Sequence, residues 1–334
     1  MLTRLKRIFL ILSVFAGTLS FAVVTLETRS IAETLDCSSS TTLESLFDCI
    51  YEHMPKKYDG YKAPTSEQKK SLRTVYGQML DGDTSIVLPP DISNIMRFFV
   101  FTDTDNGRTY SVLMEVEDGD NDDRVDRGFG TFIVYNGATR ELNIGAPHPV
   151  FDISTGYQAI RVFKNTDARS FTLAGTHRKG SNAKSLCQSS YKKSDASHNK
   201  GIGFVQATRA LMDYYRENNW HQIQFHGMGS SKCGSTDVML SHGDYKQSLS
   251  DGDILVSFRR NLLHANPTWN IQMDGGTCYL DGGSNTSGRL INGVPYRGLC
   301  TENPENYGET FIHIEQKRGS RNARDWVDAI NATF

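Results

Sequence analysis

Several features that would indicate a function at once are missing from this 334-residue chain. Beyond Leu26, no apolar run approaches the roughly 20 residues that a helix needs to cross a bilayer. No two cysteines have C-x-x-C spacing, so a cysteine zinc site or a dithiol redox centre is not indicated. The G-x-S-x-G elbow of serine hydrolases is also absent. Internal repeats, low-complexity tracts and proline-rich linkers are lacking too, which favours an ordinary globular protein.

The chain also lacks an excess of positive charge. Its formal net charge is −2. Removal of residues 1–32 takes away four basic residues and one acidic residue, which changes the charge by −3 and leaves −5. A nucleic-acid-binding protein needs a basic stripe for the phosphates, so this mild acidity argues against nucleic acid as a partner.

The N-terminal segment has the composition of a signal peptide. Basic residues precede an uncharged, largely apolar run from Ile8 to Leu26, and small residues end at Ala32. This pattern predicts a signal peptide over residues 1–32 and a secreted or periplasmic protein, with no stable membrane insertion after cleavage. The alternative is an uncleaved membrane anchor.

All six cysteines lie beyond the predicted signal peptide. An even number of cysteines in an exported chain predicts up to three disulfides. Pairing of neighbours along the sequence is the simplest arrangement, and it predicts Cys37–Cys49, Cys187–Cys233 and Cys278–Cys300.

The spacing of apolar residues changes twice along the chain. Residues 33–95 have helical spacing, and from Met96 onward β-branched and aromatic runs separated by turns predict antiparallel hairpins. After Asp152, short apolar runs alternate with helical segments, which is typical of a sheet covered on both faces. We therefore expect an N-terminal helical extension over 33–95 and an α/β domain over 96–334. The predicted fold class is a three-layer αβα fold with a mixed, mainly parallel sheet.

Polar residues end several of the apolar runs. His148 and Asp152 follow "LNIGAP", His226 ends "IQFH", and Glu315 lies in "FIHIE". Sites in α/β proteins are built where strands end at the rim of a sheet. Two histidines and a carboxylate form a standard ligand set for catalytic zinc, with the fourth position open for water. A further carboxylate such as Glu315 would activate that water.

Five short segments resemble a known group of enzymes. They are "PHPVFD", "AGTHR", "SDASHN", "FHG" and "HIEQKRGSR", within residues 140–325. Together they resemble the zinc carboxypeptidase-like superfamily, which includes zinc carboxypeptidases, N-formylglutamate amidohydrolases and phage poly-γ-glutamate hydrolases. The resemblance implies His148, Asp152 and His226 as zinc ligands and Glu315 as general base. In that group the acidic ligand is usually Glu, three or five positions after the His, whereas here it is Asp, four after.

The expected substrate contacts are basic or polar residues after strands. Arg178 follows a predicted strand, and its guanidinium can hold a carboxylate or an oxyanion. The resemblance places a substrate clamp at His198 and Asn199, where the group has Asn-Arg. Arg318 or Arg321 is a further source of positive charge. These residues predict a zinc-dependent hydrolase acting on an amide or peptide-like substrate.

Four alternatives stay open at this point. His177 is a rival zinc ligand or a substrate contact, and His313 is a candidate partner behind the ligands because it faces the same side of its strand as Glu315. The acidic run over 118–126 suggests calcium but lacks the glycine and glutamate of a calcium loop, so a solvated hairpin tip is favoured. The rival function is a non-catalytic exported binding protein with a degenerate zinc-hydrolase fold.

Overall fold

The computed structural model describes residues 33–216, 219–244 and 248–334. The predicted signal peptide, and the alternative of an uncleaved anchor, fall on residues 1–32 and lie outside this description. From Ala32 onward the chain forms one compact unit. None of the helices in the described ranges is long and apolar enough to span a membrane.

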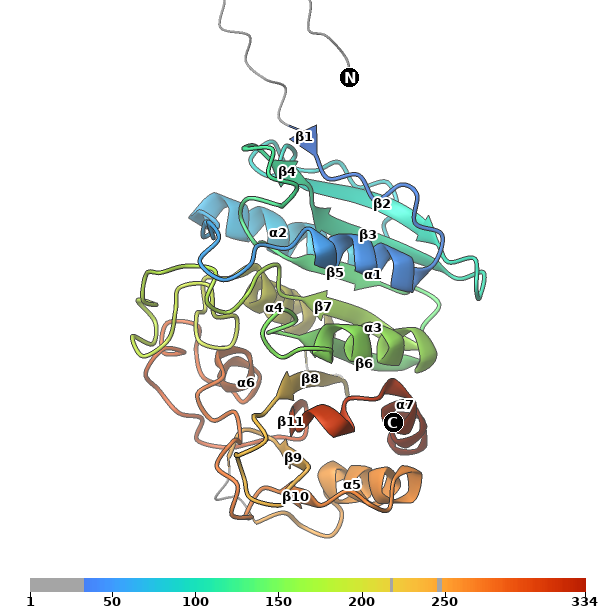
Figure 1. The fold of residues 1–334 in the computed structure, drawn as a ribbon, viewed down its shortest axis with the longest axis vertical. Helices are drawn as coiled ribbons and strands as arrows, with labels where there is room; N and C mark the ends of the chain where they lie inside the picture. Colours follow the sequence, from blue (N-terminus) through green and yellow to red (C-terminus); the bar gives the residue numbers. More distant parts are fainter. Residues whose placement is uncertain (1–32, 217–218, 245–247) are drawn as a thin grey trace, which may run out of the picture. The chain divides into compact units, whose positions relative to one another are not determined.

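The described residues contain helices, a large sheet and a small two-stranded sheet (Figure 1). After one short strand, the next two elements are helices. In chain order the elements are β1 (Glu33–Thr34), α1 (Leu43–Glu52), α2 (Ser66–Leu80), β2 (Met96–Thr102), β3 (Thr109–Glu115), β4 (Glu117–Asp118), β5 (Thr131–Val134), β6 (Arg140–Ala146), α3 (Thr155–Asn165), β7 (Ala168–Leu173), α4 (Gly203–Tyr215), β8 (His221–Gly227), β9 (Val238–Ser241), α5 (Ile254–Ala265), β10 (Ile271–Met273), α6 (Thr286–Ile291), β11 (Phe311–Gln316) and α7 (Ala323–Thr333).

The large sheet is mixed, with a parallel centre. Its nine strands lie in the order β10-β9-β11-β8-β6-β7-β5-β3-β2. The pairs β11–β8, β8–β6 and β6–β7 are parallel. The pairs β2–β3 and β3–β5 are antiparallel as the hairpin pattern predicted, and β5 also pairs antiparallel with β7. The predicted α/β fold class with a mixed sheet is confirmed. Because the central strands are parallel, their carboxyl ends meet at one rim.

Helices cover both faces of the sheet. On one face, apolar side chains of the central strands such as Ile144, Ile223 and Ile312 pack with residues of α1, α3, α5 and α7 in one core. On the other face, α2 and α4 share a second core with β3 and β5, and α6 packs on α4. The helical extension is therefore part of the outer layers, because α1 and α2 each bury an apolar side on the sheet.

The central strands carry polar side chains on the face covered by α4 and α6. Asn143 of β6, and Gln222 and Gln224 of β8, are each fully buried there. Strands buried on both faces are usually apolar throughout. Buried amides are tolerated only when their donors and acceptors find partners, so this face requires a hydrogen-bond network.

The disulfides agree only in part with pairing of sequence neighbours. Cys37–Cys49 is confirmed. The predicted pairs Cys187–Cys233 and Cys278–Cys300 are wrong, because the structure pairs Cys187 with Cys300 and Cys233 with Cys278.

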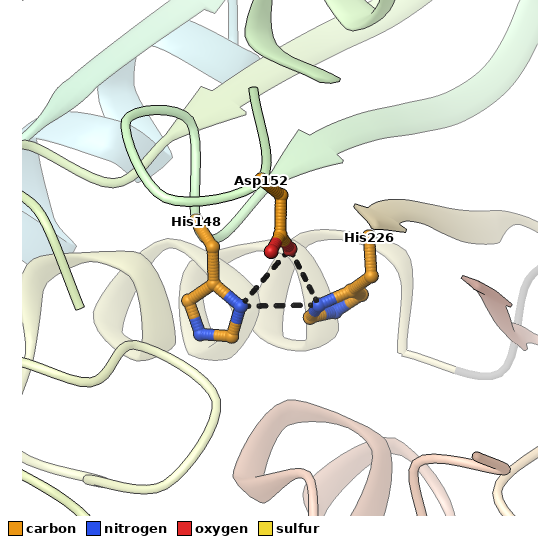
Figure 2. Close-up of side chains that lie close together, drawn as sticks. All are labelled: His148, Asp152 and His226. Carbon is orange, nitrogen blue, oxygen red and sulfur yellow. Dashed lines mark hydrogen bonds and ion pairs between the residues drawn. The ribbon is translucent and has the colours of Figure 1, made fainter. Parts of the chain in front are cut away.

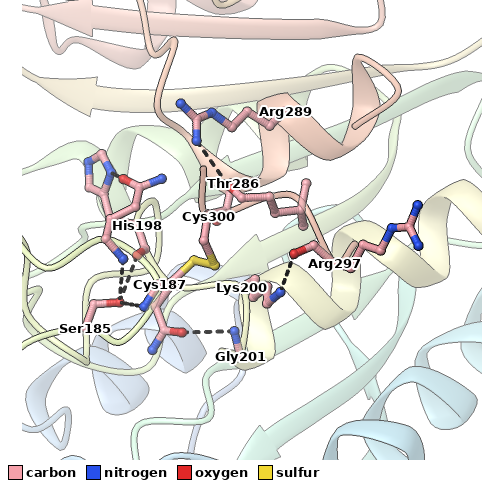
Figure 3. Close-up of a disulfide and its surroundings, with 12 residues drawn as sticks. Ser185, Cys187, His198, Lys200, Gly201, Thr286, Arg289, Arg297 and Cys300 are labelled. Atoms are coloured by element: carbon pink, nitrogen blue, oxygen red, sulfur yellow. Dashed lines mark hydrogen bonds between the residues drawn. A yellow bond between two sulfur atoms is a disulfide. The ribbon is translucent and has the colours of Figure 1, made fainter. Parts of the chain in front are cut away.

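Tertiary packing explains the difference. The loop before α4 lies against the segment after α6, and Lys200 Nζ donates to the carbonyl oxygen of Arg297 beside the Cys187–Cys300 bond (Figure 3). Cys233 precedes β9, and Cys278 follows the parallel neighbour β10. Residues remote in sequence are thus brought together by strand order.

The disulfides Cys187–Cys300 and Cys37–Cys49 close loops of different length, so we expect their removal to lower the stability by different amounts. The Cys187–Cys300 bond spans 113 residues and the Cys37–Cys49 bond spans 12. In the chain-entropy description a longer loop stabilises more, so the double variant Cys187→Ser/Cys300→Ser should lose about 4–5 kcal/mol and Cys37→Ser/Cys49→Ser about 3 kcal/mol. Urea unfolding of the four-cysteine variants and the intact protein measures both losses. An equal or smaller loss for the long loop would contradict the expectation.

Candidate functional site

Three of the predicted site residues meet at the carboxyl end of β6 and β8. His148 and Asp152 lie on the turn after β6, and His226 is the penultimate residue of β8 (Figure 2). Nδ1 of His148 is 3.4 Å from Oδ2 of Asp152 and 3.2 Å from Nδ1 of His226, and Nδ1 of His226 is 3.7 Å from the same carboxylate oxygen. All three side chains are buried.

A tight turn delivers Asp152 despite its unusual spacing. Pro149 prevents the strand from continuing, and the amides of Phe151 and Asp152 both donate to the carbonyl oxygen of His148, at 3.1 and 2.8 Å. The chain therefore reverses within four residues and returns the carboxylate to the imidazole. This turn compensates for the short aspartate side chain.

The three atoms have the separations that a metal ion requires. In a tetrahedral zinc site with ligands at 2.0–2.1 Å, two ligand atoms lie about 3.3 Å apart. The observed separations of 3.2, 3.4 and 3.7 Å fit that geometry. Imidazole nitrogen and carboxylate oxygen are also the donors that zinc accepts.

The charge states of two of these groups, His226 and Asp152, suit a cation. Burial, together with the neighbouring His148, lowers the pKa of His226 to about 4. Burial opposes ionisation of Asp152, yet its hydrogen bonds with His148 and His226 outweigh burial and hold its pKa well below the usual range. A neutral imidazole and an ionised carboxylate are the forms that bind metal.

Asp195 is a functional residue that the sequence reasoning missed. Its Oδ1 lies 2.9 Å from Nε2 of His148, and its Oδ2 accepts from Nε of Arg178 at 2.8 Å and lies 2.6 Å from Arg178 Nη2. A carboxylate behind a histidine ligand fixes the ring and its tautomer. The sequence did contain a signal for Asp195, because this residue lies in the same "SDASHN" segment as His198.

Glu315 lies beside His226 because of the strand register. The two residues are Cα partners in the parallel pair β11–β8. Oε2 of Glu315 is buried and has no hydrogen-bond partner within the described residues. Burial, and then the charge of Asp152, raise the pKa of Glu315 well above its usual value. A carboxylate with a raised pKa is a stronger base than an ordinary glutamate, which suits proton transfer.

His313 lies on the same face of β11 as Glu315, as predicted. Its ring centroid is 4.5 Å from that of His226, and its buried Nδ1 has no partner among the described residues. Nε2 of His313 is 3.9 Å from Oε1 of Glu315. His313 therefore lines the interior beside the ligands and faces the base candidate.

Arg321 supports the turn that carries Asp152. Its Nη1 donates to the carbonyl oxygen of Ile153 at 2.6 Å, and its Nη2 donates to that of Gln316 at 3.1 Å. The guanidinium occupies the space where a Cβ at Gly227 would lie. A side chain at residue 227 would therefore displace the guanidinium of Arg321. Arg318 is exposed.

The predicted substrate residues lie around this cluster in different ways. The guanidinium carbon of Arg178 is 5.2 Å from the ring centroid of Phe151, which is 41% exposed. Nδ1 of His198 lies 2.7 Å from Gln188 Oε1, and its ring stacks on Tyr191. Burial lowers the pKa of His198 to about 3.

Asn199 and His177 form hydrogen bonds with the backbone of their own loops. Nδ2 of Asn199 donates to the carbonyl oxygen of Lys193 and its Oδ1 accepts from the amide of Gly201, so both ends of this amide are used within its own loop. His177 accepts from the amide of Lys179 and contacts the Phe151 ring at the rim. The substrate-binding roles of Arg178, His198 and Asn199 stay predictions.

The acidic run over 118–126 forms a compact turn. Asp118 accepts from the amides of Asp122 and Asp123, and Asp126 accepts from the amide of Gly119 and pairs with Lys62. Asp118, Asp120 and Asp126 also offer oxygen atoms within 4.8 Å of one another, so both the calcium site and the solvated hairpin tip stay predictions.

Comparisons with known proteins give only distant similarities. No family model matches the chain, and no curated protein matches it. The solved structures that resemble it include a gene product of Agrobacterium tumefaciens (9% identity, 60% of this chain and 88% of that one, TM-score 0.38). They also include a metallo-carboxypeptidase from Burkholderia cenocepacia (12%, 82% and 68%, 0.33) and a putative carboxypeptidase A from Shewanella denitrificans (11%, 82% and 69%, 0.33). At TM-scores this low, function has to be argued from the chain's own residues.

Removal of one imidazole should abolish metal binding. The variant His226→Ala is expected to lose a metal that the intact protein retains at about one ion per chain, because two remaining ligands leave the site incomplete. Elemental analysis of protein purified without chelator measures this. His264→Ala is the matched control, since His264 is exposed on α5. A full metal content in His226→Ala would contradict the site.

Proposed function

We propose that this chain is an exported zinc-dependent hydrolase that cleaves an amide or peptide-like bond. The observation that carries the proposal is the convergence of His148 Nδ1, His226 Nδ1 and Asp152 Oδ2 beside Glu315. A ligand set of this kind leaves one tetrahedral position open, which is typical of catalytic rather than structural zinc. Three disulfides favour an oxidising compartment and support export.

Glu315 is the residue that moves protons in this proposal. A zinc ion, when bound, supplies Lewis acidity that polarises a carbonyl group and makes water more acidic. The carboxylate of Glu315 takes a proton from the attacking water and returns it to the leaving amine. The unpartnered atoms Glu315 Oε2 and His313 Nδ1 support this role, because buried polar atoms without partners at a site await water or substrate.

Arg178 supplies the positive charge near the cluster. Asp195 engages Nε and Nη2 of its guanidinium, so Nη1 is the nitrogen left to reach a substrate carboxylate or an oxyanion. The same ion pair holds the guanidinium in one orientation, which lowers the cost of ordering it when substrate binds. Phe151, against which Arg178 packs, provides an exposed apolar surface at the entrance.

Replacing the base should stop turnover without releasing the metal. Glu315→Gln keeps the size of the side chain but cannot accept the proton, so turnover of an amide substrate is expected to fall about 10²–10⁴-fold. Zinc content should stay at the level of the intact protein, because Glu315 is not one of the three ligands. Hydrolysis of a panel of N-acyl amino acids and peptides, with parallel zinc analysis, measures both effects. Retained turnover would rule out Glu315 as the base.

The second candidate is a non-catalytic exported binding protein. It is favoured by Asn199, which stands where the resembling enzymes carry the arginine of their clamp and whose amide is used within its own loop. Stoichiometric zinc together with no hydrolysis of any amide tested would favour this candidate. Hydrolysis that disappears in Glu315→Gln would exclude it.

A further inference from the structure

The two ring nitrogens of His226 have different surroundings. Nδ1 faces His148 and Asp152 (Figure 2), whereas Nε2 lies 3.4 Å from Oε1 of Gln224, two residues earlier on the same face of β8. A neutral imidazole binds metal through the nitrogen that carries no proton. The metal site therefore requires the proton of His226 to be on Nε2.

The N-terminal cap of α6 fixes the orientation of a side chain behind Gln224. Oδ1 of Asn285 accepts from the backbone amides of Ser287 and Gly288, at 2.9 and 3.1 Å. A backbone N–H can only donate, so the oxygen of Asn285 must point to the helix and its Nδ2 must point away. Nδ2 donates to Oε1 of Gln224 at 2.7 Å.

This contact defines the proton of His226. Because Asn285 offers a donor, Gln224 must present its oxygen, and the same oxygen faces Nε2 of His226. The imidazole nitrogen opposite an acceptor carries the proton. The orientation therefore passes from two backbone amides, through Asn285 and Gln224, to the histidine.

The rest of the buried network agrees with this direction. Nε2 of Gln224 donates to Oε1 of Gln222 at 2.8 Å, and Nε2 of Gln222 donates to Oδ1 of Asn143 at 3.0 Å. Nδ2 of Asn143 then donates to the hydroxyls of Ser170 and Thr172. A hydroxyl can either donate or accept, so these two residues do not constrain the direction of the network. Reversal of Gln224 would place its N–H₂ against Nδ2 of Asn285 and its oxygen against Oε1 of Gln222, and buried polar groups left without partners are destabilising.

The start of α6 also reaches the other histidine ligand. The amide of Thr286 donates to the carbonyl oxygen of Ser197 at 2.8 Å, and the amide of Ser197 donates to Oδ1 of Asp195 at 3.2 Å. That carboxylate contacts Nε2 of His148. One short helix thus supports both imidazoles from behind.

We propose that the N-terminal cap of α6 sets the tautomer of His226, with Asn285 and Gln224 as positioning residues for the metal. This inference rests on the metal site of the proposed function. Neither residue touches the ion or the substrate, and each acts through the nitrogen on which His226 holds its proton.

The decisive variant is Asn285→Asp. Aspartate is as good a helix cap as asparagine, so α6 keeps its N-terminal hydrogen bonds. However, it offers no donor to Gln224, whose amide then turns its N–H₂ toward residue 285 and toward His226. We expect the proton of His226 to shift from Nε2 to Nδ1 in metal-free protein and the zinc affinity to fall about 10–100-fold.

Two further variants separate positioning from folding. Gln224→Met removes the acceptor and should lower zinc affinity to a similar degree. Gln224→Glu keeps an acceptor for Asn285 Nδ2 and for His226 Nε2 and should retain the zinc affinity. Ser287→Ala is the control. It removes a buried hydrogen bond that Thr208 of α4 donates to Ser287 of α6, and it leaves the contacts of Asn285 and Gln224 intact. The measurements are zinc affinity by chelator competition, the tautomer by ¹⁵N-histidine NMR, and thermal unfolding of each metal-free variant.

The outcomes separate this inference from the proposed function. Intact metal-free protein with the proton of His226 on Nδ1, or unchanged zinc affinity in both Asn285→Asp and Gln224→Met, would overturn the inference. A loss of affinity in Ser287→Ala equal to that in Asn285→Asp would also overturn it, since a general loosening of α6 would then suffice. Intact protein that binds no zinc would instead overturn the proposed function, while the tautomer measurement would still test the cap.

Discussion

The constraint on which this structure depends is that buried polar groups need hydrogen-bond partners. The α4–α6 face of the central sheet carries Asn143, Gln222 and Gln224 where most α/β proteins carry aliphatic residues. Each amide has one donor side and one acceptor side, so a row of them across neighbouring strands has a direction. The row of hydrogen bonds ends at Nε2 of His226, which faces the oxygen of Gln224. An apolar face would stabilise the sheet equally well and would leave the ring free to rotate.

The cluster is therefore ordered by the protein itself. His148 is held by Asp195, and Asp152 lies on a turn that Arg321 joins to the end of β11 through Ile153. The loop before α4 supplies Asp195, and a disulfide joins this loop to the segment after α6. Loops joined in this way cost little further entropy on binding, so ligand atoms can stand ready at metal-binding separations. Among the described residues, Glu315 Oε2 and His313 Nδ1 are two buried side-chain atoms beside the cluster that have no hydrogen-bond partner.

Much of the fold was predictable because its signals are local. The change from helical to two-residue spacing at Met96 marked the hairpins, and the alternation after Asp152 marked the parallel centre. Strand order was not predictable, and two disulfides were mispaired for that reason. The spacing of Cys187, Cys233, Cys278 and Cys300 says nothing about which loops share an edge of the sheet.

The sequence by itself determined which chemical groups stand at the ends of strands, because a strand end is marked by its own residues and their neighbours. That was sufficient to select His148, Asp152, His226 and Glu315. Only the tertiary structure decided how they are oriented. The contact of Asp195 with His148 crosses 47 positions, and that of Asn285 with Gln224 crosses 61. Hydrogen bonds between residues so far apart depend on strand register and loop packing, which no local pattern encodes.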